Sequence, residues 1–182
     1  IFLDDVNYAG IGPEGGKFGP TPNIDALATG GAVCREAYVT APLCSPSRAG
    51  LVTGRYQQRF GHEMNGKQKS AEEGLPTGEK TFGDRMKALG YRTACFGKWH
   101  LGHGAGFPQY HPLERGFDEF YGFMGSMVHF FRSDALWDGR ERVKEPRYLT
   151  DVIAGRTCDF IRRHKDTPFF VYAAFNFIHT PL

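Results

Sequence analysis

The chain has 182 residues, close to the ~150 residues of a typical domain, and 41% of them are hydrophobic, which is enough for a packed core. Its 22 basic and 20 acidic side chains leave a formal net charge of +2. A charge this balanced excludes a global field that would attract nucleic acid or an anionic membrane, so recognition by charge has to be local.

The four cysteines, at residues 34, 44, 95 and 158, are unevenly spaced and form no CxxC pair for zinc or disulfide exchange. The longest apolar run, residues 169–175, is far shorter than the ~20 residues that span a bilayer, so no membrane span is expected. The chain opens without methionine, inside an apolar run, and we interpret it as part of a longer protein.

The first predicted element is a strand at residues 1–3, where the chain is apolar. A Thr-Pro pair at residues 21–22 predicts a helix that runs through Leu27 and stops at the following glycines. Residues 33–39 are predicted to form a second strand.

A Ser-Pro pair at residues 45–46 repeats the cap-then-proline pattern and predicts a helix that Gly54 would end. Apolar spacing then predicts a helix, a strand, a helix and a strand, in that order, at residues 81–89, 91–96, 150–164 and 169–177.

Residues 102–147 are rich in glycine, proline, histidine and aromatic residues and show no clean period, so long loops with short strands are expected there. Strands that alternate with helices predict an α/β fold with a mainly parallel sheet flanked by helices.

Three polar clusters follow predicted strands. They contain Asp4 and Asp5, then Lys98 and His100, and finally His179. Ligands of open parallel sheets bind beyond the carboxyl ends of the strands, so we expect these clusters to meet at one edge.

Cys44 lies at the start of a predicted helix, where unpaired N–H groups favour an anion or a polarised oxygen, and Arg48 lies four positions on, facing the same side. Taken singly, each group has an ordinary structural explanation. Adjacent aspartates often form a solvated turn, a lone cysteine is usually a small buried hydrophobe or a redox thiol, and lysine and histidine side chains often serve only packing. Their convergence is what indicates a site.

The stretches CSPSR at residues 44–48 and LVTGR at residues 51–55 match the C-x-P-S-R…T-G-R signature of the formylglycine-dependent sulfatases. The chain resembles that family in four further stretches, in the same order: LDD (3–5), TPNID (21–25), GKWHLG (97–102) and HTP (179–181). The resemblance implies the alkaline-phosphatase-like α/β fold, with residues 1–182 as the N-terminal portion of a sulfatase catalytic domain.

The resemblance also implies the chemistry. A formylglycine-generating enzyme or an anaerobic sulfatase-maturating enzyme would oxidise Cys44 to formylglycine, and the hydrated aldehyde is a geminal diol. One diol oxygen attacks the sulfur of a sulfate ester and the alcohol leaves; the second hydroxyl then loses its proton and expels sulfate. A serine lacks that second hydroxyl and would need water for this step.

By the same resemblance, Asp4, Asp5 and the converted Cys44 bind a divalent ion, Ca²⁺ or alternatively Mg²⁺, because hard oxygens suit these cations. The family's second pair of metal ligands and a further lysine would lie beyond Leu182. Asn7 departs from the glycine that many members have near the metal loop.

The remaining roles implied by the resemblance concern the sulfate group. Arg48 would hold the diol and Lys98 would bridge the nucleophile and the sulfate, stabilising developing negative charge. His100 would accept the diol proton. His179 would either contact the sulfate or help to protonate the leaving oxygen, and the two roles stay open.

The substrate implied is a sulfated carbohydrate or an aryl sulfate, and export to the periplasm, the lysosome or the cell exterior is expected. Two alternatives remain from sequence. One is a phosphate or phosphonate ester hydrolase of the same superfamily, and the other is a non-catalytic homologue that is never matured.

Overall fold

A computed structural model describes residues 1–7, 10–12, 15–16, 19–66, 74–102 and 108–180. The chain forms two compact units. The larger consists of Ile1–Asp4 and Val39–Leu182, and the smaller of Asp5–Tyr38.

A six-stranded sheet organises the larger unit. Its strands are β1 (Phe2–Leu3), β2 (Arg92–Lys98), β3 (Glu119–Phe123), β4 (Ser133–Asp138), β5 (Glu141–Glu145) and β6 (Phe169–Phe175). They are ordered β1-β6-β2-β3-β4-β5. The first four strands in this order are parallel, and β4 and β5 continue the sheet as antiparallel strands. The prediction of an α/β fold with a mainly parallel sheet is therefore confirmed.

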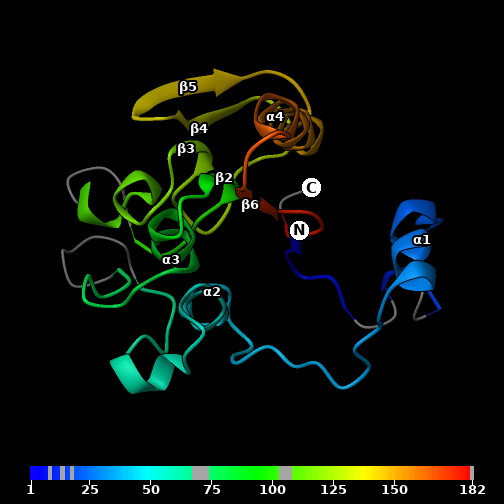
Figure 1. The fold of residues 1–182 in the computed structure, drawn as a ribbon, viewed down its shortest axis with the longest axis horizontal. Helices are drawn as coiled ribbons and strands as arrows, with labels where there is room; N and C mark the ends of the chain where they lie inside the picture. The colour runs from blue at the N-terminus through cyan, green and yellow to red at the C-terminus, as the bar shows by residue number, and fades with distance from the viewer. Residues whose placement is uncertain (8–9, 13–14, 17–18, 67–73, 103–107, 181–182) are drawn as a thin grey trace. The chain divides into compact units, whose positions relative to one another are not determined.

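Helices cover both faces of this sheet (Figure 1). The helices α2 (Cys44–Thr53) and α3 (Phe82–Ala88) lie on one face, and α4 (Leu149–His164) lies on the other. The described connections include the short 3₁₀ helices η3 (Gln57–Phe60), η4 (Pro108–Tyr110) and η5 (Pro112–Glu114). Among the described residues, none of the helices combines the length and the apolar character that a membrane crossing requires.

The side chains on the two faces of β2 belong to two separate apolar cores. Cys95 packs with Ala49 and Val52 of α2, whereas Ala94 and Phe96 pack with residues of α4. The side chains of a strand alternate between faces, so a strand covered on both sides must be apolar almost throughout. This burial fixes the position of β2 at the centre of the parallel strands.

Helix α2 begins two residues earlier than the Ser-Pro pair predicts. Its first residue is Cys44 and its N-cap is Leu43, which offers no side-chain cap, while Gly54 ends the helix in the left-handed region as predicted. Pro46 therefore sits inside the first turn. It is tolerated there because the first backbone N–H groups of a helix have no intrahelical partner.

The smaller unit contains α1 (Pro22–Gly30), which the Thr-Pro pair predicts. The Thr21 hydroxyl accepts from the Gly12 N–H at 2.9 Å and donates to Asp25 at 2.8 Å. The strand predicted at residues 33–39 is wrong. This segment has no strand partner and all its side chains are exposed, so its apolar residues alone did not make it a strand.

Within residues 102–147 the prediction of short strands is confirmed by β3, β4 and β5, with residues 103–107 outside the described part of the chain. β3 is not recognisable from sequence as an internal strand, because its three aromatic residues and one glycine show no clear alternation.

Candidate active site

Three parallel strands bring together the ends that carry the predicted polar clusters. The strands β1 and β2 flank β6 on either side. Beyond the ends of β1 and β6, the backbones remain paired: the Asp4 N–H donates to the Phe177 carbonyl at 3.0 Å, and the Ile178 N–H donates to the Asp4 carbonyl at 2.9 Å. This pairing holds Asp4 next to the segment that leads to His179.

Asp4 lies between two cations. The Lys98 ammonium donates to one carboxylate oxygen at 2.5 Å, and the Arg48 guanidinium lies 3.5 Å from the other. Lys98 and Arg48 are fully buried, and Asp4 is 5% exposed. Because charged groups are rarely buried unless they are paired, two cations around one carboxylate leave an excess positive charge inside the protein.

Arg48 is fixed by α2 on one side and by the sheet on the other. Its Nη1 donates to the Lys98 carbonyl at 2.6 Å and to the Tyr172 hydroxyl at 3.2 Å, and its guanidinium lies 4.9 Å from the centre of the Phe2 ring. Within the described residues, Nε and Nη2 of Arg48 are buried without a hydrogen-bond partner. Buried donors of this kind are expected where an anion binds.

Cys44, the first residue of α2, joins this cluster from the helix side. One potential ligand atom from each of Cys44, Asp4 and His179 lies within 4.8 Å of the other two. Both Cys44 and His179 are half-buried. The structure thus places the predicted nucleophile, one predicted metal ligand and the last predicted histidine together.

His100 follows β2 in a left-handed backbone conformation, with φ of 55°, and its side chain is 1% exposed. Burial, followed by the positive charges of Lys98 and Arg48, lowers the pKa of His100 to about 3. Its ring is therefore neutral at neutral pH. The ring atom Nδ1 is buried without a hydrogen-bond partner in the described part of the chain.

Asp5 belongs to the smaller unit, where its φ of 61° is also left-handed. Its assignment as a metal ligand stays a prediction. Pro181 of the predicted HTP stretch lies outside the described residues.

Sequence reasoning missed two residues that hold the site. Tyr172 lies in a strand that is otherwise apolar, and nothing in its spacing indicated a bond to Arg48. Ser45 was interpreted as a helix cap, but its buried hydroxyl contacts the His62 ring and the His100 carbonyl, each at 2.7 Å. The pairing of Ser45 with His62 has no local sequence signal.

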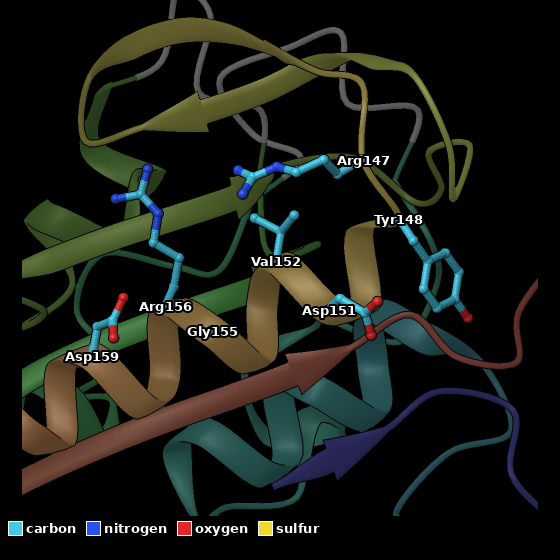
Figure 2. Close-up of a pocket in the computed structure, with 7 residues that line it drawn as sticks. All are labelled: Arg147, Tyr148, Asp151, Val152, Gly155, Arg156 and Asp159. Atoms are coloured by element: carbon cyan, nitrogen blue, oxygen red, sulfur yellow. The ribbon is translucent and has the colours of Figure 1, made fainter.

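A pocket of about 340 Å³ lies elsewhere, along α4 (Figure 2). It contains none of the predicted site residues. Figure 2 shows the side chains of Arg147 and Arg156 over the helix, but these pair with Glu145 at 2.7 Å and with Asp138 at 2.5 Å. Its positive charges are therefore already balanced, unlike those around Asp4.

Comparison with known proteins identifies the family. The family model described as Sulfatase matches residues 1–182, the whole chain. The chain belongs to the sulfatase family. N-acetylgalactosamine-6-sulfatase of Sus scrofa is 34% identical over 214 residues, and this alignment covers 100% of the chain and 39% of that protein. Human steryl-sulfatase is 42% identical over 130 residues, which cover 67% of the chain and 22% of that protein.

Solved sulfatase-family structures show the same fold. A crystal structure of Ps i-CgsB in complex with k-i-k-neocarrahexaose superposes with a TM-score of 0.90 at 36% identity. The superposition covers 99% of this sulfatase chain and 44% of the other. The chain thus spans about two fifths of the length of the N-acetylgalactosamine-6-sulfatase and of this solved structure.

Proposed function

We propose that this chain supplies the nucleophile and the anion-binding residues of an enzyme that hydrolyses sulfate esters. The observation that carries the proposal is the buried arrangement of Lys98 and Arg48 around a single carboxylate, Asp4, beside Cys44. One excess positive charge, with two guanidinium nitrogens that have no hydrogen-bond partner among the described residues, complements a group whose negative charge is spread over several oxygens.

In this proposal Cys44 is converted to formylglycine by a maturation enzyme. A diol oxygen at this position forms a bond to the sulfate-ester sulfur as the bond from sulfur to the alcohol oxygen breaks. Lys98 and Arg48 stabilise the charge on the sulfate oxygens. In the second step, the neutral His100 ring accepts the proton of the remaining hydroxyl, whose oxygen then forms the aldehyde and releases sulfate.

The donor set fits part of a shell for a hard divalent cation. Asp4 offers carboxylate oxygens, and oxidation would replace the soft Cys44 sulfur with an oxygen. We propose that Asp4, Asp5 and the converted Cys44 hold Ca²⁺, with Mg²⁺ as the alternative. Since Ca²⁺ takes about 6–8 oxygens, further ligands are needed. When bound, the ion would supply Lewis-acid polarisation of the nucleophile and the sulfate.

His179 lies in the segment that follows β6. Its ring atom is close to both Asp4 and Cys44. We assign it to the sulfate or to the leaving oxygen, and kinetics with leaving groups of different pKa separate these roles.

Sulfated carbohydrate is the substrate class that we favour. The names of the relatives support it, because one is an N-acetylgalactosamine-6-sulfatase and one solved structure holds a neocarrahexaose. An exported protein fits such a substrate. A phosphate or phosphonate ester is the alternative, because the positive charges do not discriminate strongly between sulfur and phosphorus.

The test uses the intact protein produced together with a maturation enzyme. Mass spectrometry of the Cys44 peptide should show formylglycine, and the protein should hydrolyse an aryl sulfate faster than an aryl phosphonate. Cys44→Ala should abolish turnover. Cys44→Ser is the matched control, since its single hydroxyl can accept the sulfo group but cannot expel it, so it should stop after one turnover.

Two outcomes contradict the proposal. An exclusively thiol-bearing Cys44 peptide from a maturation-competent host removes the formylglycine step. Faster hydrolysis of the phosphonate than of the sulfate by the matured protein favours the alternative substrate class.

A further inference from the structure

Two side chains tie the first turns of α2 to the end of β2. The Arg48 guanidinium donates to the Lys98 carbonyl at 2.6 Å, and the Ser45 hydroxyl donates to the His100 carbonyl at 2.7 Å. Residues three apart lie on one side of a helix, so Ser45 and Arg48 reach two carbonyls that are two residues apart. The helix that begins with Cys44 is thereby bonded directly to the backbone that carries Lys98 and His100.

We propose that Ser45 and His62 are positioning residues of the active site: His62 donates to the Ser45 hydroxyl, which in turn holds the His100 turn against the helix that carries Cys44. The inference rests on the proposed function. Neither residue is assigned a contact with the substrate.

Counting hydrogens gives the direction of these bonds. The Ser45 hydroxyl has one hydrogen, and the His100 carbonyl can only accept. The contact of 2.7 Å between the Ser45 oxygen and Nε2 of His62 therefore requires the proton to be on Nε2. With the ring as donor, the Ser45 hydroxyl can donate its own hydrogen to the His100 carbonyl.

The His100 turn needs such support. A non-glycine residue at φ of 55° is in a region that is disfavoured by steric contacts, and it persists only where the surroundings hold it. The neighbouring Trp99 is held from the sheet side, since its backbone N–H donates to the Phe123 carbonyl at 3.0 Å. The Ser45 bond fixes the same turn from the helix side.

The segment after η3 holds Ser45 at two points. Besides the bond from His62, the Ser45 N–H donates to the Asn65 side chain at 3.0 Å, which supplies the cap that Leu43 cannot provide. His62 is 8% exposed. Burial lowers the pKa of His62, and a hydrogen bond with the backbone of Gly74 partly offsets this effect.

The test compares His62→Leu, which removes the donor, with His62→Gln, whose amide nitrogen can replace Nε2. Both changes lie outside the C-x-P-S-R stretch and leave the modification signal intact. A misplacement of about 1 Å can cost about 100-fold in rate. We expect His62→Leu to lower kcat on an aryl sulfate by about 10- to 100-fold with KM changed less than about 3-fold, and His62→Gln to stay within about 3-fold of the wild type.

Ser45→Ala completes the comparison, with rates normalised to formylglycine content because Ser45 lies within the modification signal. Combined with His62→Leu it should lose no more kcat than either single variant, since both act through one bond. Unchanged kcat in folded His62→Leu, or equal losses in the Leu and Gln variants, overturns the proposal.

Side-chain ¹⁵N NMR of the intact wild-type protein tests the same bond without activity. The His62 ring should be in the Nε2–H form, and a ring protonated only on Nδ1 overturns the proposal. A matured wild type that fails to hydrolyse sulfate esters contradicts the proposed function instead, and the NMR result still decides the role of His62.

Discussion

The Lys98 ammonium lies 2.5 Å from the Asp4 carboxylate, although 94 residues separate the two in the chain. Arg48 approaches the same carboxylate at 3.5 Å. Each of these charged groups depends on the others, because a buried charge without its partner is far more costly than an intact pair.

Removing either partner of the Asp4–Lys98 pair should therefore destabilise the fold. We expect Asp4→Asn, which leaves two buried cations without a carboxylate, to lower the free energy of unfolding by about 3–5 kcal/mol. Lys98→Met leaves Asp4 paired with Arg48 and should lower it by less. The double variant should lose clearly less than the sum of the two. Urea unfolding of all four proteins measures the coupling, and additive losses would show that the pair is not energetically linked.

Gly97, the residue before Lys98, should not accept a side chain. Its φ is 109°, and a Cβ atom there would lie 2.0 Å from the Ala174 carbonyl oxygen of β6. We expect Gly97→Ala to lower the free energy of unfolding by about 3 kcal/mol or more. Gly155→Ala is the matched control: it lies inside α4 with no atom within 4 Å of the new Cβ, and it should be stabilising by about 0.5–1 kcal/mol. Similar effects of the two changes contradict the close approach of the strands.

Mild acidification should lower the free energy of unfolding, because His111 binds a proton more readily in the unfolded chain than in the folded one. Its ring is 3% exposed and packs edge-on against Phe120 and Trp137. Burial, followed by the charge of Arg140, lowers the pKa of His111 to about 4. The unfolded chain binds this proton near pH 6.5 and the folded one only near pH 4, so stability falls as the pH drops through this range.

The measurement is urea unfolding between pH 7.5 and pH 4 for the wild type and for His111→Phe. The contribution of His111 reaches roughly 3 kcal/mol at most. The variant should show a shallower loss of stability with falling pH. Parallel curves for the two proteins argue against a buried neutral ring at this position.

The cysteines should differ in their reactivity with an alkylating reagent. Cys34 and Cys158 are exposed, whereas Cys95 is fully buried and burial raises the pKa of its thiol. We expect rapid labelling of Cys34 and Cys158 at neutral pH and labelling of Cys95 only in urea. Peptide mapping at timed intervals measures this, and fast labelling of Cys95 in the native protein contradicts its position in the core.

The sheet and the helices that cover it could largely be predicted from sequence. The apolar runs that became β1, β2 and β6, and the Thr81 cap that starts α3, encode their structure locally, because burial on both faces and a capping box each leave a pattern. The segment at residues 33–39 carried the pattern of a strand without a partner, and pairing depends on residues distant in the chain.

The site likewise combines features that could be predicted from sequence with features that depend on distant residues. The positions of Asp4, Lys98 and His179 at one edge follow from parallel strand order. The charges around Asp4 depend on the packing of α2 against β6, and the Ser45–His62 contact joins segments 17 residues apart through side chains that have ordinary surface roles elsewhere. Tertiary contacts of this kind leave no periodic signal in a single sequence.

The order of the strands also means that α2 is synthesised well before the strand that packs against it. Among the described residues, β1 pairs only with β6, and α2 packs in one core with Tyr172 and Ala174 of that strand. About 130 residues separate Cys44 from the end of β6, and a ribosome adds ~5–20 residues per second. At that rate, roughly 7–26 s pass between synthesis of Cys44 and completion of the strand that packs against α2. During this interval the Cys44 segment would be accessible, still unfolded, to the maturation enzyme that we propose.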